Sequence, residues 1–157
     1  MTIREMRQSE YPLLESFLYE AIFIPVGVEP PPKSIICRPE LQVYISGFGT
    51  NEHDIAFVAD VDGKIVGAIW VRIMNDYGHV DDNTPSLAIS LYKEYRGKGI
   101  GTALMKEMLT ALKARGYKQA SLSVQKENYA TKMYQKLGFQ IIDENEEEYL
   151  MLKKLSD

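Results

Sequence analysis

A glycine-rich segment with two cations joins an apolar stretch to a helical one. It reads Arg96-Gly97-Lys98-Gly99-Ile100-Gly101-Thr102. Residues 87–91 before it are apolar enough for a strand in the middle of a sheet. After it, apolar residues recur at helical spacing over residues 100–112. A buried strand that leads directly into an amphipathic helix is typical of a sheet covered by helices, so this segment predicts an α/β fold.

The same junction predicts an anion site. The first turn of a helix has N–H groups without intrahelical partners and carries a partial positive charge. Glycines let the main chain come within hydrogen-bonding distance of phosphate oxygens, and Arg96 and Lys98 add positive charge. A plain glycine-rich turn with two solvated cations is the alternative. The strand before the segment and the helix after it favour a diphosphate site.

Two nucleotide-binding motifs fail on details of the sequence. A P-loop requires Gly-Lys-Ser/Thr, but Lys98 is followed by Gly99. A dinucleotide fingerprint requires a third glycine where Thr102 stands, and an acidic residue at the end of the next strand, which ends at Gln125. Neither kind of nucleotide site is predicted.

The remaining chain predicts a mixed sheet in one domain, residues 1–157. The clearest hairpin joins strands over residues 55–59 and 65–73 through the turn Asp62-Gly63. The other expected elements are a strand over 3–6, a helix over about 11–19 capped by Ser9, a helix that begins at Arg38-Pro39-Glu40 and ends at Gly47 and Gly49, a strand over 120–124, a helix from Asn128 to Leu137, and a final hairpin of 139–142 and 149–152. The acidic run 143–148 is interpreted as a solvated turn.

Composition excludes several classes of function. A net charge of −4 gives no basic excess for nucleic acid. Cys37 has no partner for an internal disulfide, and with only His53 and His79 no metal site is predicted. Residues 1–6 do not resemble a signal peptide, and the apolar stretch 65–73 is too short to span a bilayer. We therefore expect a cytoplasmic protein without a membrane partner.

Two motifs resemble a known family. Arg96-x-x-Gly99-x-Gly101 after an apolar strand is similar to the acetyl-CoA signature of the GNAT superfamily of N-acetyltransferases. The segment Asn128-x-Ala130-x-x-x-Tyr134-x-x-Leu137-Gly138-Phe139 resembles the second conserved segment of that family, at a suitable distance. The resemblance implies a GNAT-like fold: a mostly antiparallel twisted sheet, with helices on both faces and parallel strands that splay between residues 87–92 and 120–124.

The resemblance implies an activity and a coenzyme site. The implied reaction moves an acetyl group from acetyl-CoA to a primary amine of a small molecule or protein, by direct attack on the thioester. A homodimer is expected by analogy with relatives. Asn128 would contact the pantetheine arm, or else only cap its helix. The implied coenzyme-binding residues are Ile89, Ser90, Leu91, Arg96, Gly97, Lys98, Gly99, Ile100, Gly101, Thr102, Asn128 and Tyr134.

The resemblance also implies catalytic roles. Tyr134 matches the tyrosine that protonates the leaving thiolate, with a core aromatic as the alternative. A backbone N–H of Leu91 or Tyr92 would stabilise the oxyanion. The start of the central strand lacks the carboxylate that many relatives have there, so Asp81 and Asp82, with His79 nearby, are the candidates for the base.

The missing carboxylate leaves a second class of function open, a non-catalytic acyl-CoA-binding or sensor module. The acceptor pocket is expected to come from the first half of the chain. Arg72 is unusual in an apolar strand, and is expected either to pair with an acid or to bind a substrate carboxylate. The candidate walls of this pocket are residues 25–32, Tyr44, Trp70, Arg72 and Tyr77, with Tyr44 and Trp70 alternatively in the core.

Overall fold

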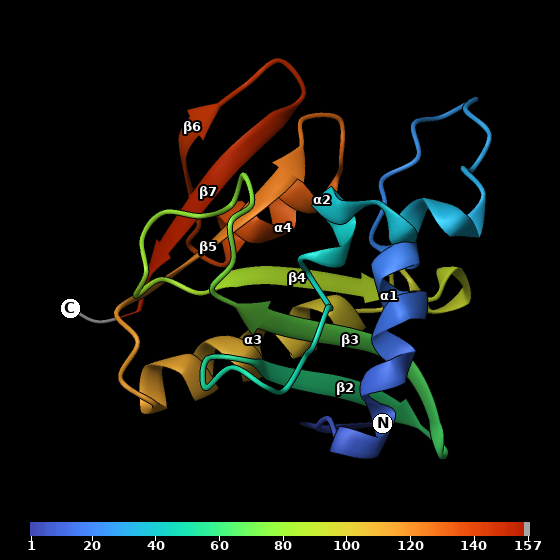
Figure 1. Ribbon diagram of the computed structural model, residues 1–157, viewed down its shortest axis with the longest axis horizontal. Helices are drawn as coiled ribbons and strands as arrows, with labels where there is room; N and C mark the ends of the chain where they lie inside the picture. The colour runs from blue at the N-terminus through green and yellow to red at the C-terminus, as the bar shows by residue number, and fades with distance from the viewer. Residues whose placement is uncertain (156–157) are drawn as a thin grey trace.

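A seven-stranded sheet with helices on both faces forms the computed structural model, which describes residues 1–155 (Figure 1). The strand order is β1-β2-β3-β4-β5-β7-β6, and every neighbouring pair is antiparallel except β4–β5. The strands are β1 (Thr2–Glu5), β2 (Ile55–Val61), β3 (Lys64–Arg72), β4 (Ser86–Leu91), β5 (Gln119–Gln125), β6 (Gln140–Glu144) and β7 (Glu148–Lys154).

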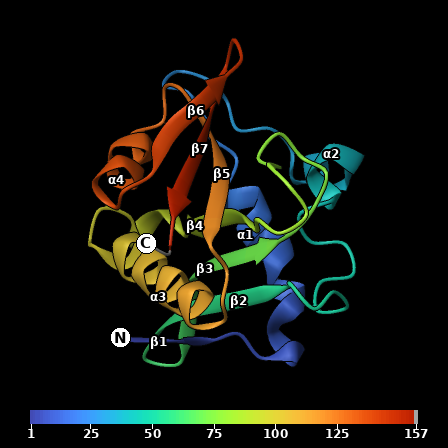
Figure 2. The ribbon, with the colours of Figure 1, turned by 90° about the vertical axis from the view of Figure 1, so that its left-hand side faces the viewer.

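The helices form two layers, which Figure 2 shows on opposite sides of the sheet: α1 and α2 on one side, α3 and α4 on the other. They are α1 (Leu14–Glu20), α2 (Pro39–Gln42), α3 (Ile100–Ala114) and α4 (Ala130–Lys136), with 3₁₀ turns η1 (Gln8–Leu13), η2 (Lys33–Cys37) and η3 (Lys93–Tyr95). Among residues 1–155, no helix combines the length and the apolar character that a membrane crossing requires.

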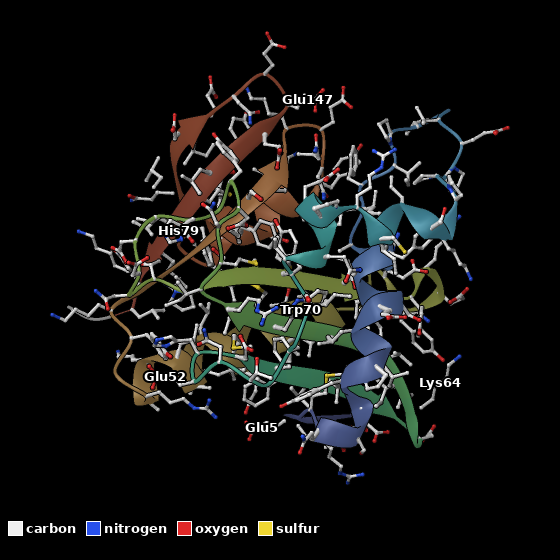
Figure 3. All side chains as sticks on the ribbon, in the orientation of Figure 1. Glu5, Glu52, Lys64, Trp70, His79 and Glu147 are labelled. Carbon is white, nitrogen blue, oxygen red and sulfur yellow. The ribbon has the colours of Figure 1, made fainter. Side chains whose placement is uncertain are left out.

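Strand alternation divides the core between these layers. In β3, Ile69 and Val71 face the larger apolar cluster around α3, and Ala68 and Trp70 face the smaller cluster around α1. Trp70, labelled in Figure 3, packs in the same cluster as Phe17 of α1. The predicted turn Asp62-Gly63 is confirmed, with φ of 52° and 87°, the left-handed values that a tight hairpin turn requires.

The parallel pair β4–β5 separates soon after it begins, as predicted. The strands share one paired position, Ser86 with Ser121. At that point the hydroxyl groups of both serines donate to the carbonyl of Gly78, in the loop after β3. Beyond it no paired positions join the two strands, so the backbone of β4 has a free edge.

Two predicted helices have different boundaries in the structure. Ser9 lies inside η1 and does not cap a helix; instead Glu10 accepts a hydrogen bond from the N–H of Arg7 (2.8 Å), and α1 begins only at Leu14. The second helix stops at Gln42 because side chains compete for its carbonyl groups. The Nε1 atom of Trp70 donates to the carbonyl of Tyr44 (3.1 Å).

Arg72 also donates hydrogen bonds to carbonyl groups that follow α2, and its side chain belongs to the core. Its guanidinium binds both carboxylate oxygens of Asp54, each at 3.1 Å, and donates to the carbonyls of Val43 (3.1 Å) and Ser46 (2.8 Å). The Arg72 residue is 8% exposed and the Asp54 side chain 0% exposed. Of the two predicted roles of Arg72, pairing with an acid is therefore confirmed, and recognition of a substrate carboxylate is wrong.

We predict that Arg72→Met lowers the free energy of unfolding by about 3 kcal/mol, because it leaves the Asp54 carboxylate buried without a cation. Urea unfolding measures this. Arg115→Met is the control, since Arg115 pairs with Glu5 (3.3 Å) at an exposed position, where a pair contributes less than about 1 kcal/mol. Equal losses in both variants would contradict the structural role of Arg72.

Candidate active site

Two adjoining cavities open where β4 and β5 separate. Cavity A, of about 1360 Å³, lies between residues 19–24, the end of β4, the start of α3, and α4. Cavity B, of about 460 Å³, lies between α2, the loop after β3, and strands β4 and β5. Both are lined by Ile89 and Tyr134, with Asn128 and residues 21–23, so these residues form the junction of the two cavities.

The main chain before α3 forms an open row of donors beside cavity A. Gly97 and Gly99 adopt φ of 75° and 85°, which favours glycine. Within the described residues, no acceptor meets the N–H groups of residues 97–102. A Cβ atom at Gly101 would lie 3.8 Å from both Leu91 and Met133, the walls of cavity A. The predicted anion site therefore has free donors and space in front of them.

The cations around cavity A differ in part from the predicted ones. Arg96 lines it, held by the carboxylate of Glu20 (3.1 Å) and the carbonyl of Leu91 (3.1 Å). Lys98 does not line it; its Nζ atom lies over the Tyr95 ring, 5.7 Å from the centroid. The side chain of Ile100, the first residue of α3, is buried in the core, so only the main chain of this residue could face a ligand.

Sequence reasoning missed three lysines that line cavity A: Lys93, Lys106 and Lys136. Lys106 comes four residues after Thr102, on the same face of α3, so helical spacing would have indicated it. Lys136 comes three residues after Met133 of α4, which also lines the cavity.

The free edge of β4 presents alternate residues to the gap. Tyr92 donates its N–H to the carbonyl of Val66 in β3 (3.0 Å). Antiparallel pairing alternates in direction, so the main-chain groups of Ser90 also face β3, and those of Ile89 and Leu91 face the gap. The Ser90 hydroxyl donates to the carbonyl of Phe17 (2.6 Å). Of the predicted oxyanion donors, Tyr92 is occupied and Leu91 is available.

Tyr134 lies at the junction of the cavities. It is 7% exposed, and among the described residues its hydroxyl makes no hydrogen bond. Burial raises the pKa of Tyr134 to about 12. The phenol is therefore protonated at neutral pH and able to donate. The Tyr134 ring also packs on Phe139, with ring centroids 6.0 Å apart, and belongs to the larger apolar cluster. Tyr134 is therefore also a core aromatic, the alternative role predicted from the sequence.

Asn128 also lies at the junction, where both of its predicted roles are compatible. Its side-chain oxygen accepts a hydrogen bond from the N–H of Ala130 (2.9 Å) at the start of α4, although the formal N-cap is Tyr129. Its amide nitrogen has no partner among residues 1–155 and lies where the cavities meet.

Two carboxylates in cavity B were missed by sequence reasoning. Asp76, in the loop after β3, accepts a hydrogen bond from the hydroxyl of Tyr44 (3.0 Å), and the Ser86 hydroxyl, which donates to Gly78, lies 3.4 Å from its other carboxylate oxygen. Burial raises the pKa of Asp76 above its ordinary value. Glu148 begins β7, and burial raises its pKa as well, with a further contribution from the nearby negative charge of Asp76. The acidic run 143–148 is thus only partly a solvated turn, because Glu148 faces the cavity.

Asp81 and Asp82, the predicted candidates for the base, line neither cavity. The carboxylate of Asp81 accepts hydrogen bonds from Thr84 (2.8 Å) and Asn83 (2.8 Å), which lower its pKa. Asp82 is exposed, and His79 lies beside it at 3.6 Å. A carboxylate in a local turn with a lowered pKa is a poor proton acceptor, unlike Asp76 and Glu148.

The residues predicted as walls of the acceptor pocket lie in different places in the structure. Tyr44 and Tyr77 line cavity B. Trp70 is fully buried beneath α1, as the alternative predicted. Of the segment 25–32, Val28 and Pro30 line cavity A rather than cavity B.

Comparison with known proteins identifies the family. Residues 15–139 match the Acetyltransferase (GNAT) family. An N-alpha-acetyltransferase of Sulfurisphaera tokodaii is 33% identical over 122 residues, which cover 67% of this chain and 72% of that protein. An acetyltransferase of Pectobacterium atrosepticum is 33% identical over 95 residues, 59% of this chain; the match spans 62% of that relative, less than two thirds of its length.

A solved structure supports the fold. The PaiA N-acetyltransferase from Thermoplasma acidophilum, solved in complex with coenzyme A, superposes with a TM-score of 0.71 over 98% of this chain and 99% of that chain, at 22% identity. The chain therefore belongs to the GNAT family of acetyltransferases, and the predicted family and fold are confirmed. In residues 1–155, no group of three or more His, Cys, Asp or Glu side chains is arranged to hold a metal ion.

We predict that the melting temperature of Asp76→Asn rises relative to wild type between about pH 4 and pH 8. The folded-state pKa of Asp76 lies above its ordinary value of 3.8, so ionisation costs the folded protein stability as the pH rises through that range. The amide does not ionise. Asp81→Asn should instead differ from wild type by a constant amount over that range, because the stabilisation from the lowered pKa of Asp81 is complete above its ordinary pKa of 3.8 and is lost only below it. Parallel pH curves for Asp76→Asn and wild type would contradict the burial argument.

Proposed function

We propose that the chain transfers an acetyl group from acetyl-CoA to an amine, with acetyl-CoA in cavity A and the amine in cavity B. The observation that supports this most directly is the row of unpaired N–H groups over residues 97–102 beside the free edge of β4. A diphosphate requires such donors, and an extended amide-bearing arm requires a strand edge with free N–H and C=O groups.

The residues around cavity A fit the coenzyme. Arg96 and the main chain of residues 97–102 would hold the diphosphate, while Lys106 and Lys136 would neutralise the remaining phosphate. Ile89 would pair with the pantetheine arm through its main-chain groups, and the Asn128 amide would bind it near the junction. Lys98 and Ile100 would contribute only main-chain N–H groups.

The amine would approach from cavity B. Its nitrogen bonds to the acetyl carbonyl carbon while the carbon–sulfur bond breaks. Glu148 would accept the proton that the nitrogen releases. We assign this role to Glu148 because it pairs with Gln125, toward the junction, whereas Asp76 lies beside Ser86, where β4 and β5 are still joined.

Two groups on the coenzyme side would complete the reaction. The N–H of Leu91 would donate to the carbonyl oxygen as negative charge develops there. Tyr134 would donate its proton to the leaving sulfur, which its position at the junction and its raised pKa allow. The proton taken up by Glu148 restores Tyr134 through solvent, so the protons balance over one turnover.

The sensor alternative depended on the missing carboxylate at the start of the central strand. Asp76 and Glu148 bring carboxylates to the same region from other parts of the chain, and this favours an active transferase. A reducing, cytoplasmic setting suits a chain whose single cysteine, Cys37, is free and exposed.

We predict that Gly101→Leu abolishes measurable binding of coenzyme A, because the new side chain enters cavity A between Leu91 and Met133. Leucine is the better helix former by up to about 1 kcal/mol, so the fold should survive. Isothermal titration calorimetry measures binding, and a melting curve checks folding. Thr110→Leu, on the exposed face of α3, is the control. Retained affinity in folded Gly101→Leu protein would contradict the placement of the coenzyme.

We predict that Tyr134→Phe lowers kcat roughly 100-fold, the effect typical of a lost general acid, while the KM for acetyl-CoA changes little. The phenol makes no hydrogen bond within the described residues, so stability should stay within about 0.5 kcal/mol of wild type. Steady-state kinetics and urea unfolding separate the two effects. An unchanged kcat would remove Tyr134 from the mechanism.

A further inference from the structure

Cavity B is acidic. The ionisable side chains that line it, apart from tyrosines, are Glu40, Asp76 and Glu148, and no Lys, Arg or His among residues 1–155 lines it. Cavity A, on the other side of the junction, is lined by several lysines. The sign of the charge therefore changes between the coenzyme side and the acceptor side.

The two inner carboxylates have no cation of their own. Within residues 1–155, neither Asp76 nor Glu148 forms an ion pair. The side-chain groups within hydrogen-bonding distance of the Asp76 carboxylate are the neutral hydroxyls of Tyr44 and Ser86. A carboxylate that is partly removed from water without a cation is costly. A positively charged ligand in cavity B would remove this cost.

Two tyrosines that line the same cavity have hydroxyl groups without a hydrogen-bond partner among the described residues, and these groups point independently to a ligand. Within residues 1–155, neither the buried hydroxyl of Tyr77 nor the hydroxyl of Tyr134, a residue that is 7% exposed, has a hydrogen-bond partner. Both residues line cavity B. A phenol oxygen accepts hydrogen bonds, so an ammonium group suits these positions as well as the carboxylates.

Among the described residues, cavity B has no cationic side chain that could bind a carboxylate of the acceptor. Arg72, the arginine of the neighbouring strand, is fully engaged by Asp54 and by the carbonyls of Val43 and Ser46. An amine that also carries a carboxylate would bring negative charge next to Asp76 and Glu148. Such an acceptor is disfavoured by repulsion.

We infer that the acceptor is a linear amine with a second positive charge and no carboxylate, that is, a di- or polyamine. The inference rests on the proposed function, in which Glu148 takes the proton of the reacting nitrogen. Asp76 would then pair with the remote ammonium at the closed end of cavity B, beside the position where Ser86 pairs with Ser121.

Three matched amines test this inference: 1,4-diaminobutane, n-pentylamine and 5-aminopentanoate, which differ only in the far group. We expect kcat/KM for the diamine to exceed that for each of the others by about tenfold or more, the size of a charge-assisted hydrogen bond. Asp76→Asn should reduce the ratio of diamine to pentylamine to near one. Glu146→Gln removes the same charge at an exposed position outside the cavity and should leave the ratio unchanged.

Binding is measured separately by calorimetry on protein saturated with coenzyme A. Preferential binding of the diamine without transfer to any amine would support the ligand class and overturn the proposed function. Acetylation of n-pentylamine, 5-aminopentanoate or a short peptide with a free N-terminus at least as well as the diamine would overturn the inference and leave the proposed function intact.

Discussion

The carbonyl of Gly78 holds together the part of the sheet on which both cavities depend. Ser86 of β4 (3.1 Å) and Ser121 of β5 donate to it, and these serines are 1% and 0% exposed. Their strands are paired there and separate immediately afterwards. A Cβ on Gly78 would lie 3.0 Å from the Asp76 carboxylate, so the loop packs without room for a side chain. The loop that holds β4 and β5 together through this carbonyl therefore also carries the Asp76 carboxylate that lines cavity B.

The separation of the strands allows opposite charges to act close together in a chain with a net charge of −4. Positive charge reaches cavity A from helices: the first turn of α3 and the side chains Lys106 and Lys136. Negative charge reaches cavity B from the loop after β3 and the first residue of β7. Ile89 and Tyr134 lie between the two charged regions, because each of them lines both cavities. With the thioester of acetyl-CoA at the junction, the phosphates of the coenzyme would be neutralised on the side of cavity A. An ammonium group of the acceptor would be attracted on the side of cavity B.

The sequence predicted what depends on neighbouring residues and missed what depends on distant ones. Segment 96–102 has its own glycines and its own helix, so an anion site could be predicted from it directly. Asp76 lies in a polar loop and Glu148 in an acidic run; both face inward only because of Tyr44, Ser86 and the β5–β7 register. The same limit explains Ser9, which has the chemistry of a cap but lies inside a 3₁₀ turn, and Asp81, whose hydrogen bonds are local.

The segment that follows α2 forms hydrogen bonds both with core side chains and with a carboxylate of cavity B. Trp70 and Arg72 take the carbonyls of residues 43, 44 and 46, which a longer helix would have used. The chain therefore turns at Tyr44, and the Tyr44 hydroxyl reaches Asp76 at 3.0 Å. A buried ion pair contributes little net stability compared with an apolar core, and a role in fixing one conformation is its best-supported use. Here the Arg72–Asp54 pair fixes the segment from which Tyr44 donates a hydrogen bond to the Asp76 carboxylate of cavity B.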